Sequence, residues 1–127
     1  MRNLISLTIL LSSFLIFSQN TPCSNFKTGE FKYSNPIYSE WSITRTDSVQ
    51  IEINSKSGIQ IYSLIEWTND CEYVLTCTNA QNTNPNNFIG KVFIVTFTNT
   101  FSDGYNCISK STDPQIKSLE LEIIKVK

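Results

Sequence analysis

Four cysteines are the residues of this chain with the most defined chemistry, and they stand at Cys23, Cys71, Cys77 and Cys107. Zinc sites usually place two cysteines two to four residues apart. The spacing of Cys71 and Cys77 is wider, and no second close pair follows. An even number of cysteines in an exported protein instead favours disulfides. The sequence therefore predicts a disulfide framework and no metal site.

Four cysteines allow three pairings, and strand geometry argues against one of them. Cys71 and Cys77 fall on one apparent strand, where six residues span about 20 Å. Bridged Cα atoms lie only about 6 Å apart, so this pair would require the segment to fold back. Of the two remaining pairings we favour Cys23–Cys71 with Cys77–Cys107. In the loop-entropy model each bridge stabilises the domain by about 4 kcal/mol.

Histidine and carboxylates would be the next residues to carry out chemistry, and the chain has no histidine. That excludes an imidazole base, a Ser-His-Asp triad and histidine-ligated zinc or haem. Glu66, Asp70 and Glu72 could supply the two carboxyl groups of a glycosidase, which lie about 5 to 9 Å apart. We interpret them instead as solvated residues at a strand–turn–strand junction. The sequence predicts no catalytic residue and no cofactor.

Arg45 is the only arginine beyond residue 2, and its planar guanidinium could hold a carboxylate or phosphate. Pairing with Asp47, or with a carboxylate on a neighbouring strand, is the alternative interpretation. Aromatic side chains, among them Tyr33 and Trp41, could line an apolar cavity or simply fill a core. The candidate ligand-binding residues are Arg45, Tyr62, Trp67 and Phe97.

The composition argues against nucleic acid as a partner. The 127 residues contain 10 lysines and arginines against 11 acidic residues, a formal net charge of −1. Nucleic-acid binding needs a clustered basic surface. With 40% hydrophobic and 12% aromatic residues, the chain can form a packed core, and its length suits a single domain. We expect a monomer.

The amino terminus has the pattern of a secretory signal. A short positive start, Met1–Asn3, precedes an apolar run, Leu4–Phe17, and the small residue Ser18. The run is too short to span a membrane, which takes roughly 20 residues. The sequence predicts a signal peptide at 1–18 and a mature all-β domain at 19–127. A lipid anchor on Cys23 is disfavoured because Thr21 and Pro22 precede it, and we expect a secreted or periplasmic protein without a transmembrane segment.

Alternation of polar and apolar residues after this leader indicates half-buried strands. In 49–54 we expect Val49, Ile51 and Ile53 to form the buried face and the polar residues between them the outer face. Residues 118–126 alternate leucine and isoleucine with glutamate, and the asparagine-rich stretch 79–87 predicts an exposed loop. About eight strands are expected, near 31–33, 41–45, 49–54, 59–67, 72–78, 91–98, 107–108 and 118–126.

Consecutive strands joined by short turns predict an all-β antiparallel meander. Eight strands can close into a small barrel whose interior is filled by side chains or holds one small ligand. A two-sheet β-sandwich is the alternative, because the number of strands does not separate the two. The apolar strand at 91–98 would be exposed at the edge of an open sheet, which favours the closed barrel.

Three segments carry a resemblance: Cys23-x-x-Phe26-Lys27-Thr28-Gly29-x-Phe31, Thr44-Arg45-x-Asp47-Ser48, and Ile65-x-Trp67-x-Asn69-Asp70-Cys71-Glu72-Tyr73. They are similar to a family of short exported Bacteroidetes proteins of uncharacterised function, over about half of the mature chain. The shared cysteines would be Cys23 and Cys71, so the resemblance implies that Cys77 and Cys107 pair with each other. Gly29-x-Phe31 also resembles the Gly-x-Trp opening of lipocalins, which implies a lipocalin-like barrel.

The sequence therefore predicts an exported, non-enzymatic β-barrel that binds a small apolar or amphiphilic ligand. A protein-binding or inhibitory envelope protein, acting through its loops, is the alternative. A small hydrolase is the third hypothesis.

Overall fold

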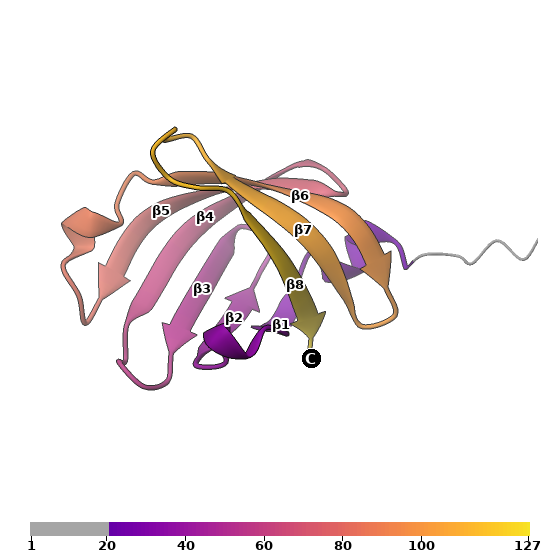
Figure 1. The fold of residues 1–127 in the computed structure, drawn as a ribbon, viewed down its shortest axis with the longest axis horizontal. Coiled ribbons are helices and arrows are strands. Elements are labelled where there is room, and N and C mark those ends of the chain that lie inside the picture. The colour runs from indigo at the N-terminus through magenta and orange to yellow at the C-terminus, as the bar shows by residue number, and fades with distance from the viewer. Residues whose placement is uncertain (1–20) are drawn as a thin grey trace, which may run out of the picture.

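The computed structural model describes residues 21–127 as a closed barrel of eight antiparallel strands joined in sequence order (Figure 1). Each strand pairs with the next, and the first pairs with the last. The predicted meander barrel is confirmed, and the sandwich is excluded. The predicted signal peptide lies outside the described residues. The strands are β1 (Gly29–Tyr33), β2 (Trp41–Arg45), β3 (Val49–Asn54), β4 (Gln60–Asn69), β5 (Glu72–Gln81), β6 (Val92–Phe101), β7 (Gly104–Ser111) and β8 (Leu119–Lys125).

The two ends of the barrel differ in their connections. At the closed end, short turns at 46–48, 70–71 and 102–103 join the strands. At the open end the connections are longer, at 34–40, 55–59, 82–91 and 112–118, and two of them contain the 3-10 helices η2 (Pro36–Tyr38) and η3 (Pro85–Asn87). In the part of the chain that is described, no helix has the length and apolar character needed to cross a membrane.

A third 3-10 helix, η1 (Cys23–Phe26), plugs the closed end. The Phe26 side chain is 1% exposed, and its ring centroid lies 5.5 Å from that of Tyr105. The Cys23–Cys71 disulfide, with Cα atoms 5.2 Å apart, ties η1 to the turn between β4 and β5. This predicted bridge is confirmed, and a disulfide is consistent with an oxidising compartment.

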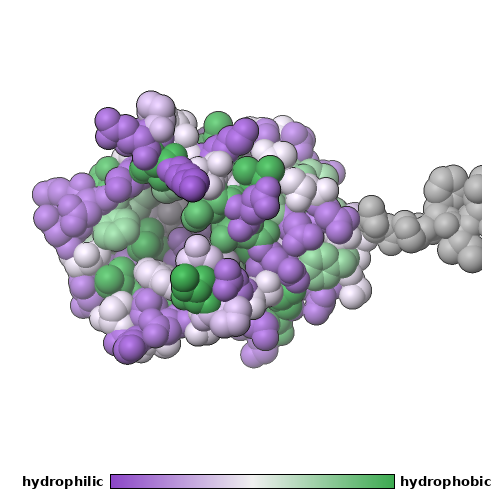
Figure 2. All heavy atoms as spheres, viewed as in Figure 1, coloured by the Kyte–Doolittle hydropathy of each residue, from purple (hydrophilic) through white to green (hydrophobic). Residues whose placement is uncertain are grey.

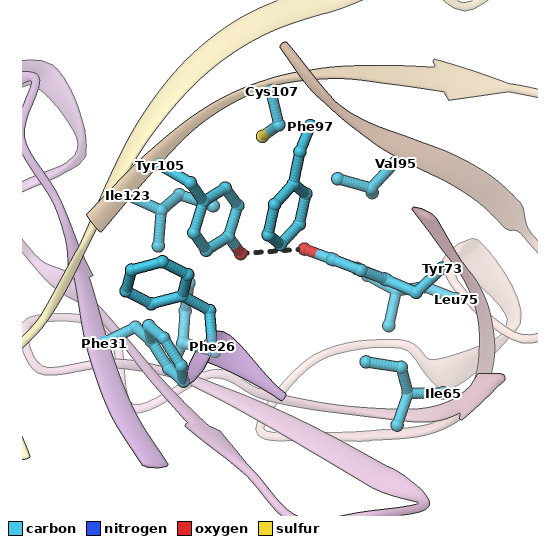
Figure 3. Packing of buried hydrophobic residues seen from close by; sticks show 11 residues of the cluster. Phe26, Phe31, Ile65, Tyr73, Leu75, Val95, Phe97, Tyr105, Cys107 and Ile123 are labelled. Carbon is cyan, nitrogen blue, oxygen red and sulfur yellow. Dashed lines mark hydrogen bonds between the residues drawn. The ribbon is translucent and has the colours of Figure 1, made fainter. Parts of the chain in front are cut away.

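Aromatic packing fills the closed half of the barrel (Figure 3). The rings of Phe97 and Tyr105 stack with centroids 3.9 Å apart, and Tyr73 meets Phe97 edge-on at 6.1 Å. Such pairs contribute about 0.5–1.5 kcal/mol each beyond the burial of their area. The buried cluster consists of Phe26, Phe31, Ile43, Ile65, Tyr73, Leu75, Val95, Phe97, Tyr105, Cys107 and Ile123.

Closure of the barrel between β1 and β8 depends on Gly29. Its φ is 132°, a backbone conformation that side chains rarely allow, and an added Cβ would lie 2.5 Å from the carbonyl oxygen of Lys127. The start of β1 and the carboxyl-terminal residues form a short ladder there, in which the amide of Glu30 donates to the same carbonyl at 2.9 Å. The glycine of the Gly29-x-Phe31 pattern is thus required by the close approach of β1 to the carboxyl terminus.

The faces of β3 are reversed relative to the prediction. Gln50 and Asn54 are buried, at 3% and 7% exposure, whereas Val49 is 36% exposed. The register explains the reversal, because Gln50 lies directly opposite Arg45, which already faces the interior. The apolar residues of β3 lie on the outer face, where Val49 is opposite Leu64 of β4.

The predicted Cys77–Cys107 bridge is wrong, because both thiols are free and buried. Cys107 is level with Phe97 on the neighbouring strand, and the amide of Phe97 donates to the carbonyl of Cys71. These two contacts put Cys107 at the level of Cys71, just before the start of β5. Cys77 is six residues beyond Cys71 along the chain, or about 20 Å at the rise of a strand. Disulfide formation requires Cα atoms about 6 Å apart.

The asparagine-rich loop expected at 79–87 begins later than predicted, because β5 continues to Gln81.

We expect replacement of Cys23 and Cys71 together by serine to lower the free energy of unfolding by about 3–4 kcal/mol, because the bridge closes a long loop. Urea unfolding of the double variant and the wild type measures the difference. Alkylation of the denatured, unreduced protein should add two groups, at Cys77 and Cys107. Mass spectrometry that finds four modified thiols, or none, contradicts the assignment.

Candidate functional site

The open half of the barrel contains a cavity above the aromatic core. It consists of two lobes of about 190 and 200 Å³, which share the four lining residues Tyr33, Glu52, Leu119 and Leu121. The two lobes therefore adjoin and form one cavity. Figure 2 shows a hollow in this face of the molecule, bordered by hydrophobic side chains.

The walls of the cavity are mostly apolar and aromatic. Of the described residues, 21–127, Glu52 is the only one with a formal charge that lines either lobe. The outer lobe is completed by Tyr38, Trp41 and Ile61. The inner lobe is completed by Gln50, Tyr73, Leu75, Phe93, Val95 and Ser109.

Glu52 reaches the cavity from β3 and accepts a hydrogen bond on Oε1 from the hydroxyl of Tyr33 on β1. Burial raises the pKa of the Glu52 carboxyl, and the opposing effects of Tyr33 and of the Arg45 charge only reduce that rise. Burial and the negative charge of Glu52 raise the pKa of Tyr33 well above its ordinary value. The tyrosine therefore keeps its proton and is the donor. Within 21–127 no other group donates to this carboxylate, so Oε2 is available to the cavity.

Arg45 forms a hydrogen-bonded cluster below the cavity, and its side chain is 2% exposed. Its Nη1 donates to the carbonyl of Phe26 at 2.8 Å, and Nε and Nη2 donate to Oε1 of Gln50 at 3.0 and 2.9 Å. Nη2 also reaches the hydroxyls of Tyr73 and Tyr105, at 3.1 and 2.9 Å. The guanidinium is thus bound by neutral groups from η1, β3, β5 and β7.

Arg45 does not serve as the anion clamp or the ion-pair partner considered from the sequence. No ion pair in residues 21–127 includes it, and Asp47 lies in the exposed turn after β2. Gln50 and Tyr73 contact both the guanidinium and the cavity. These two residues form a floor that separates the arginine charge from any occupant of the cavity.

The other three candidate ligand residues also lie outside the cavity lining. Phe97 is in the solid core, and Trp67 packs at the closed end with its ring centroid 4.8 Å from that of Tyr73. Tyr62 is on the outer face of β4, where its hydroxyl donates to Gln60 at 2.6 Å. The sequence could not distinguish these aromatic side chains from those that line the cavity, because only their position along each strand separates the solid half from the hollow half.

The cavity residue that sequence analysis missed is Glu52. Alternation assigned it to the outer face, together with Gln50, and the reversal of β3 brings both inside. One available signal was the spacing of Arg45 and Gln50, because a hairpin loop formed by the four residues between them places the two residues opposite each other. Tyr33 and Trp41, which were considered as cavity-lining aromatics, do line it.

The carboxylates considered for hydrolysis lie on the surface and do not converge. Glu72 accepts hydrogen bonds from Thr68 at 2.7 Å and Thr96 at 2.9 Å, which lower its pKa. Asp70 forms an ion pair with Lys27 at 2.7 Å. Glu66 is exposed on β4.

A larger depression, of about 530 Å³, lies at the closed end between η1, the 102–103 turn and the carboxyl-terminal residues. It is a shallow surface groove outside the barrel, and two of its lining residues are Lys125 and Lys127. Because strands enclose the interior cavity on its sides, that cavity is the better candidate for a specific site.

Comparisons with protein-family models, with curated protein sequences and with solved structures gave no significant match to this chain. The resemblance to the exported Bacteroidetes family stays a prediction.

We expect Glu52→Gln to change how stability depends on pH. Because burial raises the pKa of Glu52 above the ordinary value of 4.5, the folded protein binds this proton more tightly than the unfolded chain. Wild-type stability should therefore fall as the pH rises from 4.5 through the folded pKa. The free energy of unfolding of Glu52→Gln minus that of the wild type should increase over this range in urea titrations.

Glu72→Gln is the matched control, because hydrogen bonds lower the pKa of Glu72. The stabilising contribution of Glu72 is present above its unfolded pKa and is lost as the pH falls. The free energy of unfolding of Glu72→Gln minus that of the wild type should therefore decrease as the pH rises, whereas the difference for Glu52→Gln increases. Equal trends for the two variants would contradict a buried Glu52.

We expect Arg45→Met to lower the free energy of unfolding by about 3 kcal/mol or more, because the buried carbonyl of Phe26 and the amide of Gln50 lose their donor, at about 1–3 kcal/mol each. Tyr105→Phe removes one hydroxyl from the same cluster and should cost about 1 kcal/mol. Chemical unfolding measures both variants. An Arg45→Met effect no larger than that of Tyr105→Phe would contradict the central role of the guanidinium.

Proposed function

We propose that this protein is an exported, non-enzymatic binding module that holds one small, largely apolar ligand in the open half of its barrel. The observation that carries the proposal is the cavity lined by Tyr33, Trp41, Glu52 and Leu121. Its two lobes together reach the lower part of the size range of ligand pockets, about 300–1,000 Å³. An eight-stranded barrel has an interior of the right width for one small ligand.

The division of the barrel into two halves suits this role. The disulfide, the plug formed by Phe26 and the Arg45 cluster hold the closed half, so the cavity floor is formed before a ligand arrives. A preformed apolar cavity limits the ordering cost of binding. The entrance is next to the 34–40 loop and the start of β8, where Ile37 is 76% and Leu119 46% exposed.

The compartment belongs to the same proposal. The leader at 1–18 would direct the chain to a secreted or periplasmic location, where the Cys23–Cys71 disulfide is maintained. We propose that the mature protein acts as a monomer without a lipid anchor. The lipocalin-like character of the barrel and the family resemblance are part of this hypothesis.

A protein-binding role is the second candidate function, and the loops of the open end support it. Ile37 and Ile89 are 76% and 49% exposed, on the 34–40 and 82–91 loops. A partner protein that contacts these two loops would remove both side chains from water. A partner bound there would cover the entrance to the cavity.

Binding of a neutral apolar dye, N-phenylnaphthylamine, tests the cavity. We expect its fluorescence to rise with the wild type and its affinity to fall about tenfold or more in Ser109→Phe, because the added ring occupies the inner lobe. Ser42→Phe adds the same ring to the exposed outer face of β2 and should leave the affinity unchanged. Equal affinities for the two variants, or no binding by the wild type, contradict a ligand-binding cavity.

A further inference from the structure

The charge that the cavity presents to a ligand is negative. In the part of the chain that the structure describes, Glu52 is the only charged residue in its lining. Arg45, the one cation among the buried side chains of residues 21–127, is 2% exposed, and each of its three side-chain nitrogens already donates to Phe26, Gln50 or a tyrosine. An anionic ligand would therefore meet the Glu52 carboxylate without reaching the guanidinium.

Three aromatic side chains, those of Tyr33, Tyr38 and Trp41, line the outer lobe together with Glu52. Tyr33 and Tyr38 have ring centroids 5.4 Å apart with planes tilted by 53°. Lys32 pairs with Ser42, so the next residues along each strand, Tyr33 and Trp41, are neighbours. Trp41 and Glu52 line the same lobe from adjacent strands, β2 and β3, as diagonal neighbours in the register. Aromatic faces within about 6 Å attract an ammonium group.

Among the residues that the structure describes, none forms an ion pair with the Glu52 carboxylate. Burying a carboxylate is costly unless it is paired and hydrogen-bonded, and here a single hydroxyl, that of Tyr33, donates to one of its two oxygens. A cationic group placed in the outer lobe would supply both a donor and a charge. The cost of holding Glu52 in the barrel would then be offset in the bound state.

We infer that the ligand is a small organic cation, an ammonium group on an apolar or aromatic body, held by Glu52 inside a cage formed by Tyr33, Tyr38 and Trp41. The inference rests on the proposed function, because it specifies what the same cavity selects. The ammonium group lies in the outer lobe against the carboxylate. The apolar body lies along Leu119 and Leu121 toward the inner lobe, whose floor is formed by Gln50 and Tyr73.

Three ligands of similar shape test the charge preference: phenethylamine, phenethyl alcohol and hydrocinnamate. The chain has two tryptophans, so Trp67→Phe leaves Trp41 as the only one and makes its fluorescence report on the outer lobe. We expect phenethylamine to bind about tenfold or more tightly than the alcohol, and hydrocinnamate to bind most weakly. This comparison of three ligands uses the Trp67→Phe variant with Glu52 intact. Its result therefore does not depend on how a Glu52 variant folds.

Substitution of the carboxylate identifies its role. Glu52→Gln in the same background should weaken phenethylamine binding about tenfold and leave the alcohol nearly unchanged, because only a charged ligand gains from the carboxylate. Glu72→Gln, which changes a carboxylate on the outer surface, should affect neither ligand. Loss of amine selectivity in Glu52→Gln but not in Glu72→Gln supports the inference.

Two results would overturn it, and they are distinguishable. If the alcohol or hydrocinnamate binds as tightly as the amine, the cavity binds ligands but does not select cations, and the proposed function stands alone. If neither these ligands nor N-phenylnaphthylamine binds, the proposed function fails together with the inference.

Discussion

The buried guanidinium of Arg45 is the interaction on which the closed half of this barrel depends. A full charge in an apolar interior is costly unless its donors are satisfied, and here four residues from four segments satisfy them. The hydroxyls of Tyr73 and Tyr105 also lie 3.1 Å apart and point toward each other (Figure 3). The aromatic faces of Phe31 and Tyr73, at 4.4 and 4.8 Å from the guanidinium carbon, complete its surroundings.

The same interaction determines which face of β3 points inward. Gln50 lies opposite Arg45 and accepts from two of its nitrogens. Because side chains alternate along a strand, Glu52 and Asn54 must follow Gln50 to the inner face. Asn54 accepts hydrogen bonds from the amides of Lys56 and Ser57 and so holds the turn to β4. Glu52 has only Tyr33, and its remaining oxygen gives the cavity its charge.

The hollow half contrasts with the solid half in a way that argues for function. A protein selected only for stability would fill the open end with apolar side chains, because empty volume in a core costs packing energy. Here a carboxylate with a raised pKa and three aromatic rings surround the space instead. Stability is concentrated at the closed end, where the disulfide and Phe26 lie, so the open end can retain a partly polar cavity.

Local patterns in the chain determined the strands and their meander, because alternation and turn residues act between near neighbours. The alternation in 118–126 indicated its inward face, and the favoured Cys23–Cys71 bridge, which the family resemblance also implied, is present. Local patterns could not predict which face of β3 points inward. That depends on the register in which β3 pairs with β2, where Gln50 lies opposite Arg45. Nor could they show that Cys77 and Cys107 lie at different levels of the barrel, or that the aromatic residues divide between a filled and a hollow half. Those features depend on which strands lie side by side, and only closure of the barrel brings them together.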